Sequence, residues 1–403
     1  MLVARAVRRC ALPALAVALA LTACTSGSSP GDRRGSEPKG PAVTISSPKA
    51  NATDVPASAE IEFKADGASS TTVELADADG NAVAGDMRPE GTAWLPRAQL
   101  DYDTKYTATV TATDVDDRTT TVKSSFTTMA RPANLVRVSS VVGDDMTIGV
   151  GMPMIIQFGR DVPEKLRASV QRRMFVRSTP AQEGSWHWFS ASEVHYRPKA
   201  FWRPGTKLDM RVLAGGLPLG AGWYGRADLT VVAQVGSALT MNVDNATKRM
   251  TVTENGKVIR IIPVSLGRPG MPSSSGTMLV MERLRKTIFD TTHDPNPANR
   301  YKIPIEYAQR ITWGGEFIHA APWSVADQGV RNVSHGCINM STANAKWLFA
   351  KTRLGDPVTV RGTERQVQVG NGWTDWSMSW GAYVQGSALG PSAGGAIGSG
   401  GGG

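Results

Sequence analysis

Only one cysteine lies beyond residue 24 of this 403-residue chain, in the stretch "SHGCIN" from Ser334 to Asn339. This residue, Cys337, follows His335 by two positions and follows a second histidine, His319 in "FIHAAPW", by eighteen positions. A cysteine nucleophile must lose its proton, and a nearby imidazole can accept that proton. These residue types therefore permit nucleophilic catalysis by a thiol, with His319 and His335 as the two candidate bases.

The glycine between His335 and Cys337 affects which histidine can act. A His-Gly-Cys turn would separate the two side chains, whereas His319 is free to approach from a neighbouring strand as the base. Gly336 also lacks a side chain, so backbone N–H groups can approach a developing oxyanion. The residues alone leave open a buried structural cysteine with two satisfied histidines. A metal site is less favoured, because one cysteine and two histidines lack the regular ligand spacings and no acidic partner lies nearby.

The region from about residue 235 is predicted to be mostly β with at least one helix. A hairpin is expected around Asn255-Gly256, which is a strong type I′ turn signal. Ser341 can cap a helix through "TANAKWLFAKTR", and Gly355 follows the end of that helix. The segment Glu282–Pro304 is interpreted as a lid-like loop, with His293 at its surface.

The residues before this region favour two modules of short strands. "YTATVTATD" places Tyr106 and Val110 on one face with threonines on the other. Residues 129–234 repeat the scheme of residues 41–128, with "YRPKAFWRPGTKLDMRV" resembling "WLPRAQLDYDTKYTATV". We therefore expect two tandem immunoglobulin-like β-sandwiches. The aromatic cluster from Trp186 to Phe189 and the imidazole of His195 are interpreted as packing.

The two ends of the chain carry separate signals. Residues 1–23 read as a leader, and the small residues before Cys24 resemble a bacterial lipobox, in which the cysteine is lipidated. Residues 24–40 form a Ser/Gly/Pro-rich linker, and residues 390–403 are too glycine-rich to pack. Loss of the leader lowers the formal charge by three, from +9 to about +6. Because no zinc spacing or basic-aromatic strip occurs, we expect no nucleic-acid partner.

The region from about residue 238 to 362 resembles the YkuD-type L,D-transpeptidase catalytic domain. The resemblance rests on His319, the "SHGCIN" signature and the stretch "ENGKVIRIIPVSLGRPGMPSSSGTM". The lipobox, the two immunoglobulin-like modules and "WTDWSMSW" (Trp373 to Trp380) resemble the mycobacterial-type lipoprotein members. The implied fold is mainly β, divided as follows: signal peptide 1–23, linker 24–40, immunoglobulin-like domains 41–128 and 129–234, catalytic domain 235–362, Trp-rich C-terminal extension 363–389 and disordered tail 390–403.

The resemblance also implies residue roles. Cys337 is the expected nucleophile and His319 the general base. The backbone carbonyl of Ala320 is expected to orient the imidazole of His319, at a position where relatives often have serine. The main-chain N–H groups of His335, Gly336 and Cys337 are expected to bind the oxyanion. The expected substrate-binding residues are Tyr301, Trp323, Ser334 and Asn339.

The function implied by the resemblance is acyl transfer between peptidoglycan stem peptides, a donor tetrapeptide and an acceptor stem. A Cys337 thioester would form with release of D-alanine and then give a 3→3 cross-link, without metal or cofactor. We expect a monomer held by lipid on Cys24 at the outer face of the cytoplasmic membrane, with the sandwiches as spacer or as a wall-binding part. The alternatives are an L,D-carboxypeptidase, attachment of a protein to peptidoglycan, and a non-enzymatic wall-binding lipoprotein in which Cys337 is inert.

Overall fold

The computed structural model describes residues 40–293 and 295–390. The predicted leader, the lipidation of Cys24, nearly all of the linker and the glycine-rich tail lie outside these residues and stay predictions from sequence. The described residues are mainly β, which confirms the predicted fold class. None of the helices among them is long and apolar enough to cross a membrane.

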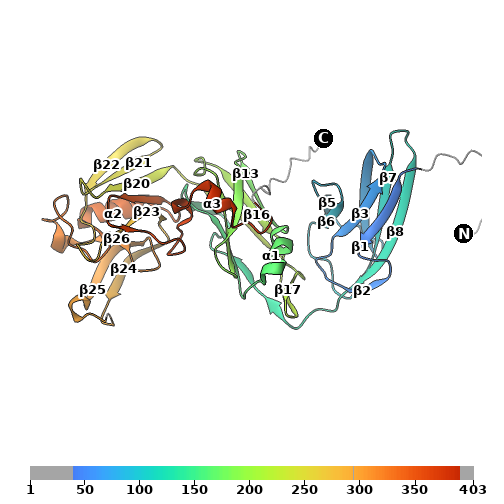
Figure 1. Cartoon of the computed structure of the whole chain (residues 1–403), viewed down its shortest axis with the longest axis horizontal. Helices are drawn as coiled ribbons and strands as arrows, with labels where there is room; N and C mark the ends of the chain where they lie inside the picture. The colour runs from blue at the N-terminus through green and yellow to red at the C-terminus, as the bar shows by residue number, and fades with distance from the viewer. Residues whose placement is uncertain (1–39, 294, 391–403) are drawn as a thin grey trace, which may run out of the picture. The chain divides into compact units, whose positions relative to one another are not determined.

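Residues 42–128 form two sheets around one core (Figure 1). The expected alternation in "YTATVTATD" is confirmed, since Tyr106, Ala108, Val110 and Ala112 are all buried. These four side chains contribute to the face of the strand that covers the core, while the threonines point away from it. In strand order, the sheets consist of β1 (Ala42–Ser47), β3 (Ile61–Asp66), β6 (Ala93–Pro96) and β5 (Gly85–Met87), and of β2 (Ala52–Val55), β8 (Thr119–Thr128), β7 (Lys105–Thr113) and β4 (Ser70–Asp77).

Residues 135–235 form a second set of sheets with one helix, α1 (Glu164–Gln171). The predicted packing role of the aromatic cluster is confirmed, because Trp186 and Trp188 are buried in the core. The sheets consist of β10 (Val138–Ser140), β12 (Met154–Phe158), β15 (Glu193–Pro198) and β14 (Gly184–Trp188); of β11 (Met146–Ile148), β19 (Leu229–Val235), β16 (Lys207–Val212) and β13 (Met174–Thr179); and of β17 (Pro218–Gly220), β18 (Trp223–Gly225) and β9 (Leu135–Val136).

The third domain holds a six-stranded and a four-stranded sheet around a common core. The turn Asn255-Gly256 joins β21 to β22, and both of its residues have positive φ, as expected of a type I′ turn. The first sheet consists of β22 (Lys257–Pro263), β21 (Arg249–Glu254), β20 (Leu239–Asp244), β28 (Pro357–Arg361), β23 (Ser274–Leu279) and β29 (Arg365–Gln366). The second consists of β24 (Glu282–Asp290), β25 (Lys302–Arg310), β26 (Phe317–Ala320) and β27 (Ile338–Met340).

The predicted helix of this domain is α2 (Thr342–Lys351), which packs against β25 and β26 (Figure 1). The Ser341 side chain accepts a hydrogen bond from Asn344 N, which satisfies one of the free N–H groups of the first turn. The helix ends at an extended C-cap residue, Thr352, and Gly355 takes a left-handed conformation, with φ of 86°, in the turn that leads to β28. The short 3₁₀ turns η1 (Pro297–Asn299), η2 (Pro322–Ser324) and η3 (Asp375–Ser377) lie in the connections.

The prediction that Glu282–Pro304 is a loop is wrong in its local structure. Most of this segment belongs to the antiparallel hairpin of β24 and β25, and only residues 291–301 form its turn. Phe289 and Ile303 pack beside Phe317, so the hairpin has a small apolar core of its own. Burial of these apolar side chains stabilises the two strands although the segment carries many charged residues. Those charged residues are the reason why the sequence suggested a loop. His293 is exposed, as predicted.

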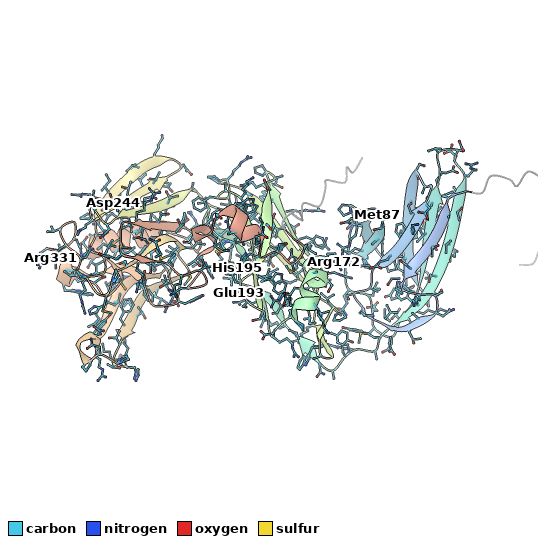
Figure 2. The ribbon with its side chains drawn as sticks, in the orientation of Figure 1. Met87, Arg172, Glu193, His195, Asp244 and Arg331 are labelled. Carbon is cyan, nitrogen blue, oxygen red and sulfur yellow. The ribbon has the colours of Figure 1, made fainter. Side chains whose placement is uncertain are left out.

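The Trp-rich extension, which includes η3 and α3 (Trp380–Val384), contacts the second sandwich through a buried polar network. Burial disfavours the charged imidazole of His195, but Asp375 at 2.9 Å and Glu193 at 3.1 Å outweigh it and raise the pKa of His195 to about 9. Figure 2 shows Glu193 and His195 adjacent on β15. Tyr383 Oη donates to the His195 carbonyl at 3.0 Å. His195 therefore has the structural role predicted for it.

We expect His195→Gln to lower the free energy of unfolding by about 3 kcal/mol, because it leaves Asp375 buried without its cation. The pKa of His195 is raised from 6.5 to about 9, so its stabilisation is complete below about pH 6.5 and is lost as pH rises through about 9. Urea unfolding of both proteins at about pH 6 and about pH 10 measures this. The control is Lys199→Gln, which breaks an exposed pair with Glu183. Equal losses in the two variants would contradict the prediction.

Candidate active site

The pairing of β26 with β27 brings the two main candidate residues to one cavity. The strands run parallel, with Ile318 opposite Ile338 and His319 opposite Asn339. Both isoleucines are fully buried in the domain core, so the alternating residues His319 and Asn339 face the other side. Cys337 lies in the bend directly before β27 and lines the same cavity as His319 and Asn339.

The ring of His319 is fixed in one tautomer. Its Nδ1 lies 2.8 Å from the backbone oxygen of Ala320, and since a carbonyl can only accept, Nδ1 carries the proton. This is the contact expected for Ala320, and it needs no side chain at residue 320. Burial lowers the pKa of His319 to about 4, although the Ala320 carbonyl partly opposes this. At neutral pH the ring is therefore neutral, and its Nε2 can accept a proton.

Cys337 is half-buried, with its sulphur in contact with backbone groups. Its Sγ donates weakly to the carbonyl of Gly315 at 3.7 Å. Burial raises the pKa of this thiol to about 12; a backbone hydrogen bond from Phe317 acts in the opposite direction, and the carboxylate of Glu316 adds to the rise. In the resting protein both Cys337 and His319 are uncharged.

The "SHGC" loop is held by two serine hydroxyls. Ser334 Oγ donates to the Cys337 carbonyl at 2.7 Å and accepts from Gly336 N–H at 3.1 Å. Ser273 Oγ donates to the Gly336 carbonyl at 2.6 Å. The N–H group of Gly336, expected to bind the oxyanion, thus donates to Ser334 Oγ in this structure, and its oxyanion role stays a prediction. The Ser334 hydroxyl, expected to bind substrate, is occupied in the same way, although Ser334 lines the adjoining cavity.

The ring of His335 is held by Arg268. Its Nε2 lies 2.6 Å from Nη1 of Arg268, and a guanidinium can only donate, so Nε2 is an acceptor. Arg268 N also donates to the Ser334 carbonyl at 2.9 Å. The ring of Tyr301 lies 5.3 Å from that of His335, centroid to centroid. The side chain of His335 thus belongs to the wall of the site.

Glu316 and Arg365 form an ion pair beside the "SHGC" loop. Glu316 is buried and accepts from both N and Oγ of Ser274, and it forms an ion pair with Arg365 of β29. A Cβ on Gly336, whose φ is +124°, would stand 3.7 Å from both Arg365 and Glu316. The loop therefore lies close to the ion pair of Glu316 and Arg365.

Two cavities meet at Cys337. One, of about 410 Å³, contains His319 and is lined by Trp323, Ser334 and Asn339. The other, of about 390 Å³, is lined by Met271, Gly314 and Gly315 but not by His319. The residues common to both cavities are Phe289, Tyr301, His335 and Cys337. The structure thus places all four residues expected to bind substrate on the cavity that contains His319.

Sequence reasoning did not select Asp327, Arg268 or Glu316. A signal existed for Glu316, a charged residue beside the apolar strand of "EFIHAA". Asp327 and Arg268 lie in polar loops, where charged residues are common and follow no spacing that would indicate a site. Across residues 40–293 and 295–390, His, Cys, Asp and Glu side chains form no group of three that could hold a metal ion.

Comparisons with known proteins match both parts of the chain. Residues 52–217, which cross both sandwich modules, match the family model of a bacterial Ig domain, and residues 240–360 match the L,D-transpeptidase catalytic domain. L,D-transpeptidase 2 of Mycobacterium tuberculosis is 33% identical over 396 residues, which cover 95% of this chain and 96% of that protein. L,D-transpeptidase 5 of the same organism is 33% identical over 366 residues, or 88% of this chain and 79% of the relative. L,D-transpeptidase 1 is 33% identical over 218 residues, which cover 53% of this chain and 80% of that protein.

Proposed function

Since the chain belongs to the L,D-transpeptidase family, we propose that it forms 3→3 cross-links between peptidoglycan stem peptides through a Cys337 thioester. One observation carries this proposal. A neutral imidazole with an accepting Nε2 lines the same cavity as the thiol, and a second cavity also reaches that thiol. A nucleophile, a base and room for two substrates are what a two-step acyl transfer requires.

In the first half-reaction, Cys337 passes its proton to His319 Nε2 as the sulphur attacks the carbonyl of the third residue of a donor tetrapeptide. The tetrahedral intermediate then expels the amine of D-alanine, which takes the proton back from His319. The C–N bond breaks, a thioester forms and no net proton is released from the imidazole. Desolvation of the pair keeps both groups neutral until a substrate occupies the site.

In the second half-reaction, an amine of the acceptor stem attacks the thioester. His319 removes a proton from that amine as the C–N bond forms, and the sulphur leaves and is reprotonated by His319. The amine that leaves and the amine that attacks exchange a proton with the same nitrogen atom. The leaving amine therefore departs through the cavity that contains His319, the attacking amine enters through it, and the donor acyl chain extends into the other cavity.

The test is muropeptide analysis after incubation of the purified protein with disaccharide tetrapeptides. We expect dimers linked between the third residues of two stems, together with one released D-alanine for each dimer. Tripeptides without such dimers would replace the proposal by the alternative, an L,D-carboxypeptidase in which water takes the place of the acceptor. Unchanged tetrapeptides with folded protein would favour a non-enzymatic wall-binding protein.

A further inference from the structure

The cavity that is not lined by His319 has a cation on its wall that no step above uses. Arg310 lines this cavity together with Cys337 and Phe317. Its place follows from the register of three adjacent strands, because Arg310 in β25 lies opposite Glu282 in β24 and opposite Phe317 in β26. Strand alternation puts Arg310 on the same face as Ala308, whose apolar cluster also packs against Cys337. The side chain therefore extends from the face of the sheet against which the nucleophile packs.

The guanidinium of Arg310 is held by two contacts that leave one of its edges unused. Its Nε donates to Glu282 Oε2 at 2.9 Å, and its Cζ stands 4.4 Å from the centre of the Phe317 ring. Within the described part of the chain, no residue accepts a hydrogen bond from Nη1 or Nη2 of Arg310. Neither of these nitrogen atoms is buried, so both can donate to a ligand.

The charge of Arg310 acts on the thiol and is only weakly balanced. Burial raises the pKa of the Cys337 thiol, and the positive charge of Arg310 is among the effects that oppose this rise. Glu282 is 44% exposed and does not line the cavity, so solvent weakens its attraction for the guanidinium. Asp290, the carboxylate on the cavity wall, is paired instead with Lys302 at 2.8 Å. The wall thus presents a cation whose counter-ion lies outside the cavity.

We propose that Arg310 binds a carboxylate of the donor stem and thereby determines which donors the protein accepts. A guanidinium can donate two parallel N–H groups to a carboxylate or to a phosphate. A peptide stem offers only carboxylates, and the terminal one leaves with D-alanine through the cavity that contains His319. The group at Arg310 is therefore a carboxylate of the acyl part that stays on Cys337. The inference rests on the proposed function, because that function places the donor acyl chain in this cavity.

The contact with Arg310 selects between donors by their charge. A primary amide has nearly the shape of a carboxylate, but it is neutral and has only one accepting oxygen. Charge-assisted hydrogen bonds are about twice as strong as neutral ones. Arg310 should therefore favour a donor with a free carboxyl group over the same donor with that group amidated. Because the contact lies away from the reacting carbonyl and is made before and during the reaction, the preference should appear in KM rather than in kcat.

The experiment measures D-alanine release by the full chain from disaccharide tetrapeptides whose side-chain carboxyl groups are free or are amidated one at a time. The readout is the ratio of kcat/KM for the free donor to kcat/KM for each amidated donor. A change in the thiol alters both rates equally and cancels in this ratio. Alkylation of Cys337 by iodoacetamide, which is uncharged, measures that change separately.

Three variants are compared with the wild type. Arg310→Gln removes the charge, and Arg310→Lys keeps the charge but loses the paired N–H groups. Glu282→Gln is the matched control, because it breaks the ion pair and leaves the guanidinium on the cavity wall. Circular dichroism and urea unfolding check that each variant is folded.

We expect the wild type to prefer the free donor about tenfold over one of the amidated donors, the size of one hydrogen bond between charged groups. Arg310→Gln should reduce this preference to within about twofold by raising the KM of the free donor. Arg310→Lys should show an intermediate preference of about threefold, whereas Glu282→Gln should keep that of the wild type. If Arg310→Gln does not fold, the decrease expected in Arg310→Lys carries the test.

Three results would overturn the inference while the proposed function stands. The first is dimer formation by the wild type at an equal or lower rate from the free donor than from every amidated donor. The second is an unchanged preference in Arg310→Gln. The third is an equal loss of preference in Glu282→Gln, since the preference would then follow the ion pair and not the guanidinium. If the wild type acts on none of these donors, the proposed function itself fails.

Discussion

Replacing Cys337 with alanine is expected to abolish acyl-enzyme formation and cross-linking together, by about 10⁴-fold or more. The reason is that no other cysteine lies among the described residues, and this cysteine lines both cavities and is the nucleophile that we propose. Removal of a nucleophile that acts as a unit with its base costs nearly the whole covalent contribution. The measurement is intact-protein mass after incubation with a carbapenem, followed by muropeptide analysis.

The control for this variant is stability. Cys337 is half-buried beside a small apolar cluster, so its replacement should cost only about 1 kcal/mol of unfolding free energy. Cys337→Ser keeps the volume and a polar hydrogen but lacks a thiolate, and it should be as inactive as the alanine variant. A stable carbapenem adduct on folded Cys337→Ala would contradict the assignment of the nucleophile.

Replacing His319 with alanine is expected to lower the rate of acylation by about 10³-fold, the usual contribution of a positioned general base. The loss should exceed that usual for a cysteine enzyme with a preformed thiolate, because here the thiol pKa is raised to about 12 and the imidazole must generate the nucleophile. His335→Ala is the matched comparison. Since the His335 ring is held by Arg268, its removal should cost much less than the removal of His319.

The pH dependence of acylation supplies a separate check on the His319 assignment. Burial lowers the pKa of His319 from 6.5 to about 4, so the acid limb of kcat/KM should fall near pH 4 rather than near pH 6.5. The stability of the folded protein is expected to fall in the same direction, as pH decreases. The lowered pKa gives stabilisation that is present above about pH 6.5 and is lost as pH falls through about 4. An acid limb at pH 6.5 would contradict a buried, neutral His319.

The position of His319 could be expected from the sequence because it follows apolar residues of a short strand, whereas Cys337 follows a polar loop and directly precedes the next short strand. Alternation of buried and facing side chains is a local property, and Ile318 and Ile338 reveal which face is buried. The capped helix after Ser341 and the Asn255-Gly256 turn are local in the same sense. Each depends on a few adjacent residues whose backbone preferences can be read directly.

The features that the sequence did not reveal depend on contacts between distant segments. The β24–β25 hairpin forms because Phe289 packs on Phe317, twenty-eight residues later, and a run of charges gave no sign of it. Gly336 N–H is used by Ser334 Oγ, a choice between donors that spacing alone cannot make. Asp327 lines a cavity together with residues that are distant from it in the sequence, so its position there could not be inferred from its own loop.

The raised pKa of the Cys337 thiol has a consequence for the protein between turnovers. Oxidants and alkylating agents react with thiolates, and a thiol with a pKa of about 12 offers almost none at neutral pH. An idle copy should therefore resist peroxide far better than a free cysteine in solution does. The same burial that leaves the nucleophile dormant until substrate arrives would then also preserve it, giving each molecule a longer working life wherever no reducing system is at hand.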